Sequence, residues 1–129
     1  MVEFALLTPR NYVANVTQLV MTLRSVELHI LLSVVDRPRH GYAILQEAEE
    51  RTGGKPGFEI PTFYRAIRRL QVAGLIRAAD GEPDADERRE YWETTKLGRQ
   101  ALEAELKRLE VVLAVGRART KQATAGGRK

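Results

Sequence analysis

Residues 62–73 constrain the fold most, because they read as one amphipathic helix with a defined end. Four apolar residues recur at the i, i+3, i+4, i+7 spacing of a single helix face. They are Phe63, Ala66, Ile67 and Leu70. Thr62 precedes them as a candidate N-cap, and Gly74 follows as a candidate left-handed C-cap. The sequence therefore predicts a helix that packs on a core and passes directly into a strand at 75–79.

The other faces of this helix are rich in arginine. Four arginines and no acid lie between residues 60 and 77. Arginine can bridge the O6 and N7 atoms of guanine or pair with a phosphate, and the first turn of a helix attracts phosphate through its free N–H groups. A solvated helix surface is the alternative, and the element order favours DNA contact over it. The candidate contacts are Thr62, Tyr64, Arg65, Arg68 and Arg69.

Three helices are expected before this one. The first, at 9–23, carries an apolar stripe made of Val13, Val16, Leu19 and Val20. The second covers 25–35 with Ser25 as its cap, and Pro38 prevents its continuation. The third covers 41–52 and ends at a pair of glycines.

A β-hairpin is expected after the arginine-rich helix. Strands at 75–79 and 89–94 flank a polar turn. Arg88 and Arg89 near the tip can reach the minor groove or the DNA backbone, although the acids beside them oppose a phosphate surface. Tyr91 and Trp92 are neighbours in a strand, so one ring must face the core and the other must face outward. Packing is the favoured role for Trp92, and a ligand cavity is the alternative.

The last expected helix covers 95–115. Its leucines are spaced by four, three and four residues, which favours a short seam for pairing with a second helix, and packing in the core of the same chain is the alternative. They are Leu102, Leu106, Leu109 and Leu113. Residues 116–129 show no apolar periodicity and are expected to be a disordered basic tail. We therefore divide the chain into 1–24, 25–94, 95–115 and 116–129.

Composition excludes several classes of protein. The 129 residues carry a net charge of +4, but the five cations of 116–129 leave residues 1–115 at −1. The absence of cysteine and the presence of only two histidines argue against a metal site within one chain. No nucleophile–base pairing, phosphate loop or cofactor motif is present, so an enzyme is not expected. With no export signal or long apolar stretch, the expected location is the cytoplasm.

Several motifs in fixed order resemble the PadR family of bacterial transcriptional regulators. They are His40-Gly41-Tyr42, Pro61 to Leu70, Gly74-Leu75-Ile76, Arg89 to Trp92, and Thr95-Lys96-Leu97-Gly98. The resemblance spans about residues 26–113. Pro61, Ile67 and Thr94 depart from the family pattern, and Thr94 stands where leucine is usual.

The resemblance implies a mainly α-helical winged helix-turn-helix with a two-stranded β wing, an N-terminal helix and a C-terminal dimerisation helix. It further implies a dimeric repressor that binds a palindromic operator in double-stranded DNA and is released by a small-molecule effector. Dimerisation would use the stripe of the first helix and the leucine seam of the last. Within this motif His40 and Tyr42 are candidate DNA contacts, but a structural role at a helix start is favoured for His40, and packing against the arginine-rich helix is favoured for Tyr42. For Tyr64, DNA contact is only slightly favoured over packing.

A second function stays open at this point. A winged helix can serve as a protein–protein module without any specific DNA target. Substitution of the helix arginines would then leave partner binding intact, which distinguishes this alternative from DNA binding.

Overall fold

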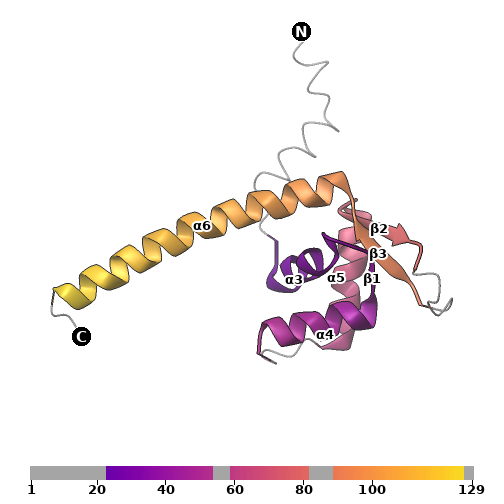
Figure 1. Ribbon diagram of the computed structural model, residues 1–129, viewed down its shortest axis with the longest axis horizontal. Coiled ribbons are helices and arrows are strands. Elements are labelled where there is room, and N and C mark those ends of the chain that lie inside the picture. Colours follow the sequence, from indigo (N-terminus) through magenta and orange to yellow (C-terminus); the bar gives the residue numbers. More distant parts are fainter. Residues whose placement is uncertain (1–22, 54–58, 82–88, 127–129) are drawn as a thin grey trace, which may run out of the picture.

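The computed structural model describes residues 23–53, 59–81 and 89–126. Their helices are α3 (Ser25–Val34), α4 (Gly41–Arg51), α5 (Ile60–Val72) and α6 (Lys96–Ala125), and their strands are β1 (Arg39–His40), β2 (Ile76–Ala79) and β3 (Tyr91–Thr94). The expected helix at 9–23 lies outside these ranges apart from Leu23, and so does Arg88. Figure 1 shows α3, α4 and α5 gathered beside the small sheet, with α6 extending away from them.

The sheet has three strands rather than the expected two. All pairs are antiparallel in the order β1-β3-β2, with His40 opposite Tyr91 and Ile76 opposite Thr94. The prediction missed β1 because two residues after a proline are too short to show any alternation of apolar and polar side chains. The consequence is that His40 is held against the wing.

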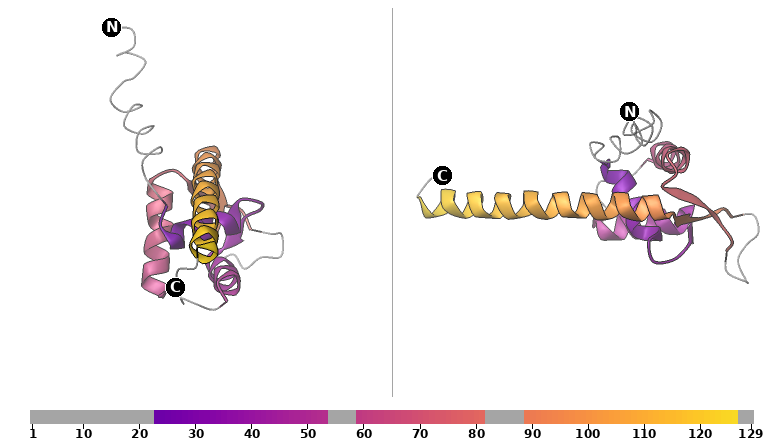
Figure 2. Two further views of the ribbon diagram at one scale, coloured as in Figure 1. Left: turned by 90° about the vertical axis from the view of Figure 1, so that its left-hand side faces the viewer. Right: turned by 90° about the horizontal axis from the view of Figure 1, so that it is seen from above.

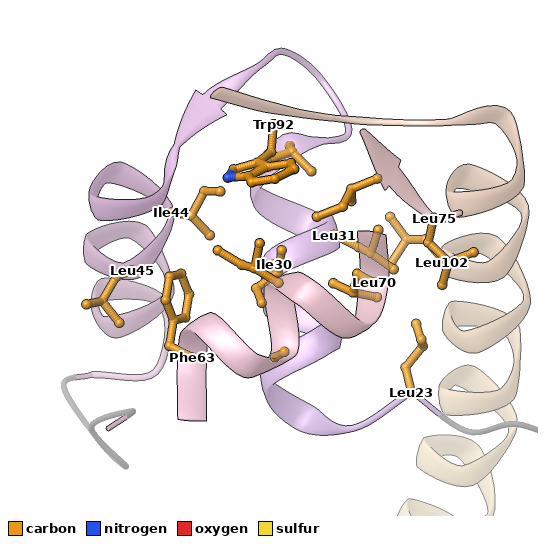
Figure 3. Packing of buried hydrophobic residues seen from close by; sticks show 14 residues of the cluster. Leu23, Ile30, Leu31, Ile44, Leu45, Phe63, Leu70, Leu75, Trp92 and Leu102 are labelled. Carbon is orange, nitrogen blue, oxygen red and sulfur yellow. The ribbon is translucent and has the colours of Figure 1, made fainter. Parts of the chain in front are cut away.

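Apolar side chains from α3, α4, α5 and the sheet meet in one core (Figure 3). Ile30, Ile44, Phe63 and Leu70 are fully buried, and Trp92 is buried beside them. The predicted apolar face of α5 is therefore confirmed. Trp92 packs in this core, in agreement with the favoured interpretation of that residue.

Gly74 ends α5 as predicted. Its φ of 79° is left-handed. The N–H of Leu75 donates to the carbonyl of Leu70 at 2.9 Å, and the N–H of Gly74 donates to that of Gln71 at 3.0 Å. These two bonds form a Schellman motif, which turns the chain directly into β2.

Thr95 and Gly98 join α6 to this turn. The hydroxyl of Thr95 accepts from the N–H of Gly98 at 3.0 Å and donates to the carbonyl of Gly74 at 2.6 Å. A Cβ at Gly98 would stand only 2.0 Å from the carbonyl oxygen of Leu75. Only glycine therefore lets α6 begin this close to the end of α5.

The predicted starts of two helices were wrong. Arg24, not Ser25, is the N-cap of α3. Helix α5 begins at Ile60 after Glu59, so Thr62 lies inside the first turn and does not cap it. Pro61 explains the earlier start, because proline is favoured in the first turn, where its missing N–H has no partner to lose.

The predicted end of the last helix was also wrong. Helix α6 continues through Gly116 to Ala125, so residues 116–125 are helical rather than disordered. One glycine inside a helix costs only about 1 kcal/mol relative to alanine, and the residues that follow it are good helix formers. The right-hand view in Figure 2 shows the distal half of α6 clear of the rest of the described chain.

Candidate nucleic-acid interface

Helix α5 presents a polar outer face opposite its buried one. Tyr64, Arg65 and Arg68 are exposed, while the neighbouring Phe63 and Ile67 point into the core. The nearest contact of Arg65 is a 3.3 Å hydrogen bond from Nη2 to the hydroxyl of Thr62. Arg68 makes no hydrogen bond or ion pair with any described residue. Both guanidinium groups are thus available to an anion.

The other two arginines of the predicted cluster are held by carboxylates. Nη1 of Arg69 lies 2.7 Å from Oε2 of Glu27 on α3, and Nε of Arg77 lies 2.7 Å from Oε2 of Glu93 on the neighbouring strand. Arg69 was predicted to contact DNA, but its charge is already paired within the protein. Of the four arginines in this cluster, only Arg65 and Arg68 therefore lack a carboxylate partner among the described residues.

His40 joins α4 to the wing. Its Nδ1 accepts the N–H of Ala43 at 3.2 Å, which caps α4, and its ring stands edge-on to Tyr91 with centroids 5.4 Å apart. Burial, assisted by the nearby charge of Arg89, lowers the pKa of His40. The predicted structural role at a helix start is confirmed by this geometry.

The other ring nitrogen of His40 faces Arg89. Nε2 lies 2.8 Å from Nη1 of Arg89. Because Nδ1 accepts the cap hydrogen bond, a neutral ring carries its proton on Nε2, and guanidinium groups only donate. Two donors therefore meet at contact distance, which is unfavourable, and an anion bound beside both nitrogens would relieve it.

Tyr64 lies against the same end of α4. A Cβ added to Gly41 would stand 2.9 Å from the Tyr64 hydroxyl, so glycine is what lets the two helices approach here. His40, Gly41, Tyr64 and Arg89 line a hollow of about 310 Å³. Tyr64 is still 48 % exposed, so packing and an outward-facing hydroxyl coexist in one side chain.

Tyr42 stands at the rim of this hollow and is exposed. Its hydroxyl accepts a hydrogen bond from Nε2 of Gln46, one turn along α4, at 3.3 Å. The favoured expectation of packing against the arginine-rich helix does not describe this exposed ring.

The leucine seam of α6 divides into two parts. Leu102 is buried in the core of its own chain, so it is not available to a second chain, contrary to the prediction. Leu106, Leu109 and Leu113 instead line an open apolar groove of about 820 Å³, with Leu106 40 % and Leu113 52 % exposed. Heptad spacing could not separate the two parts, because the same face of α6 first packs on the domain and then leaves it.

The sequence analysis missed one residue next to the arginines. Glu27 is buried, and its two carboxylate oxygens bind the backbone N–H of Arg24 at 2.9 Å and the guanidinium of Arg69 at 2.7 Å. An acid three residues after a helix cap was a readable signal, since that position commonly folds back onto the cap N–H. The expected cap at Ser25 hid this signal, because the third residue after Ser25 is Leu28, whereas the third residue after Arg24 is Glu27.

Two further features are absent from the described ranges. Those residues hold no group of three or more histidine, cysteine, aspartate or glutamate side chains that could bind a metal ion. No helix among them is long and apolar enough to cross a membrane.

Three helices, a short β1 and a two-stranded wing define a winged helix-turn-helix, with α5 in the position of the recognition helix. The family model of the PadR-like transcriptional regulators matches residues 30–104, which is more than half of the chain. The chain belongs to this family. It is accordingly a DNA-binding transcription regulator, and non-enzymatic regulators are what the family comprises.

The chain is also similar to individual proteins, and the solved structures among them share its fold. An uncharacterised protein from Lysinibacillus sphaericus is 32 % identical over 73 residues, which is 57 % of this chain and 67 % of the relative. The crystal structure of a PadR family regulator from Clostridium difficile has a TM-score of 0.63 at 20 % identity, covering 74 % of this chain and 97 % of that one. A transcriptional regulator from Clostridium thermocellum gives a TM-score of 0.61 at 24 % identity, covering 72 % and 87 %.

Proposed function

We propose that this protein is a sequence-specific repressor that binds a palindromic operator as a homodimer and is released by a small-molecule effector. The observation that carries the DNA contact is the outer face of α5, where Arg65 and Arg68 have no acidic partner among the described residues. A helix with such a face fits the major groove, where arginine reads guanine.

The hollow at the base of the wing supplies a second contact, to the DNA backbone. His40 and Arg89 direct N–H groups to one place, beside the Tyr64 hydroxyl and the start of α4. A phosphate there would accept from both donors and sit at the positive end of the helix. Tyr42, at the rim, is placed to contact the same strand, whereas the neighbouring Glu90 must turn away. Phosphate contacts of this kind fix the register that the base contacts then read.

The apolar groove on α6 supports the dimer. Its three leucines are the continuation of a heptad seam, and burying them removes apolar surface from water at about 25 cal/mol per Å². Two chains paired there would present two copies of α5 about 34 Å apart, one turn of B-DNA. The stripe Val13, Val16, Leu19 and Val20, outside the described residues, is assigned to the same interface. Leu106→Glu with Leu113→Glu should convert the dimer to a monomer in sedimentation equilibrium.

An effector would act by changing the spacing of the two recognition helices. A ligand shifts this equilibrium only if it binds one arrangement better than the other. Addition of the effector should therefore weaken operator binding without dissociating the α6 seam.

DNA-protection mapping on the DNA upstream of the protein's own gene tests the proposal. The expected footprint has two protected half-sites, related by two-fold symmetry and about 10 base pairs apart. Uniform protection at all concentrations, or none, would contradict specific binding. If Arg65→Ala retained a protein partner in pull-down while no footprint formed, the winged helix would be a protein–protein module instead.

A further inference from the structure

A carboxylate buried beneath the recognition helix makes a directional link to it. Glu27 lies in the first turn of α3, and its side chain is only 5 % exposed. Each of its oxygens has a different donor: Oε1 accepts the N–H of Arg24 at 2.9 Å, and Oε2 accepts Nη1 of Arg69 at 2.7 Å. The first bond fixes the carboxylate to its own helix, so the second bond ties α5 to that fixed point.

The position of Arg69 on α5 gives this link its effect. At about 100° per residue, Arg65 and Arg68 lie about 30° on either side of the centre of the outer face, and Arg69 lies about 70° from that centre, on the side of Arg65. Arg69 therefore stands on the edge of the face where α5 meets α3. Any rotation of α5 that separated Arg69 from Glu27 would turn Arg65 and Arg68 by the same angle.

The apolar packing of α5 opposes rotation through shape and not through a directional bond. Phe63, Ala66, Ile67 and Leu70 bury a broad stripe, and hydrophobic contact is non-directional. A charge-assisted hydrogen bond is short and directional, and breaking one leaves a buried charge without its partner. The Glu27–Arg69 pair thus adds a directional constraint to the shape packing of the core.

Building on the proposed DNA-binding function, we propose that Glu27 is a positioning residue for sequence recognition. Through Arg69 it sets the rotation of α5 that presents Arg65 and Arg68 to the bases. Arg69 itself does not contact DNA, although it lies next to Arg68 in the sequence and carries the same charge.

Salt dependence separates a positioning arginine from a contacting one. Each phosphate contact contributes about −0.9 to the slope of log affinity against log salt concentration. Arg69→Gln should therefore leave the slope of the wild type unchanged. Arg68→Gln, the matched control from the neighbouring outward-facing position, should make the slope shallower by about one if it meets phosphate, and should abolish discrimination at one base pair if it meets guanine.

The ratio of affinities for the operator and for random DNA is the second readout. Partial unfolding lowers both affinities by the same factor, so the ratio reports only the arrangement of the folded protein. We expect Arg69→Gln and Glu27→Gln each to lower this ratio about tenfold. The double variant should be no worse than either single one, because both substitutions break one link.

The complete test is therefore an anisotropy titration of wild type, Glu27→Gln, Arg69→Gln, their double variant and Arg68→Gln, with operator and random duplexes at stepped salt. A slope that becomes shallower by about one in Arg69→Gln, or an unchanged ratio in Glu27→Gln, overturns the positioning role. A wild type that does not distinguish the operator from random DNA overturns the proposed function itself, which makes the two failures distinguishable.

Discussion

The arginines on the two sides of α5 and its following strand resemble each other in sequence but not in environment. Arg65 and Arg68 face outward and meet no acid among the described residues, while Arg69 and Arg77 each lie 2.7 Å from a carboxylate. A paired arginine has fewer N–H donors left for a phosphate, and its carboxylate partner already offsets its charge. Local net charge in the sequence therefore locates a DNA-binding helix, but it does not show which of its arginines contact the DNA.

The largest effect on DNA binding is expected at the outward-facing pair, Arg65 and Arg68. Replacing Arg65 and Arg68 together with alanine should lower operator affinity by about 30-fold or more, since a good arginine contact to a base is worth about 1–3 kcal/mol. Titration of a labelled operator measures the loss. Glu49→Ala on α4 is the control, and an equal loss there would remove the distinction.

The neighbouring residues Arg68 and Arg69 should differ in their contribution to the free energy of unfolding. Arg69→Gln should lower the free energy of unfolding by about 1–3 kcal/mol, because it leaves the buried Glu27 carboxylate without its charged partner. Arg68→Gln should change it by less than about 0.5 kcal/mol. Urea denaturation followed by circular dichroism measures both. Equal effects would mean that Arg69 is no more anchored than Arg68.

The arginine at the wing extends the comparison to pH. Burial lowers the pKa of both His40 and His29, and the charges of Arg89 and Arg51 respectively add to that effect. The unfolded chain therefore binds protons first, at about pH 6.5, so stability is complete above that value and falls as the pH decreases toward the folded pKa.

His40→Asn keeps a capping side chain on α4 but cannot titrate in this range. Denaturation of wild type and His40→Asn at pH 7.5, 6.5 and 5.5 should show a weaker loss of stability in the variant. Parallel curves would show that the cap does not sense protons.

The smallest effect is expected at the second paired arginine. The Arg77–Glu93 bridge is largely exposed on the wing, and such pairs contribute only about 0–1 kcal/mol. Arg77→Gln should therefore shift the unfolding free energy by less than about 0.5 kcal/mol and leave the salt slope of DNA binding intact. A shallower slope would show that Arg77 binds a phosphate in place of Glu93, and that Arg77 belongs with the DNA-contacting arginines Arg65 and Arg68.

Much of this architecture was readable from the sequence because local signals were strong. The stripe Phe63 to Leu70 and the turn at Gly74 each have one structural solution, and the structure adopts it. In contrast, the sequence analysis could place Gly41 and Gly98 only as members of motifs that resemble the family, without a structural reason for either glycine. Glycine is needed at Gly41 because the backbone there lies close to Tyr64, and at Gly98 because it lies close to the carbonyl of Leu75. These close approaches arise only in the folded chain, so the sequence does not show them.

The remaining features depend on residues far apart in the chain. Glu27 and Arg69 are separated by 42 positions, and no periodicity links them. Leu102 and Leu106 share a heptad seam, yet one is buried in its own chain and the other is open. The continuation of α6 past Gly116 depended on how weakly one glycine opposes a helix. Sequence patterns define faces, whereas packing decides what each face meets.

The most direct test of the central claim is the operator affinity of Arg65→Gln beside that of Arg69→Gln over a range of salt concentrations. Both variants lose one charge from the same helix. We expect Arg65→Gln to make the salt slope shallower or to abolish discrimination at one base pair, and Arg69→Gln to change neither and to lower only the overall preference for the operator. The same change in slope for both variants would show that all the arginines of α5 act alike, and would contradict the account.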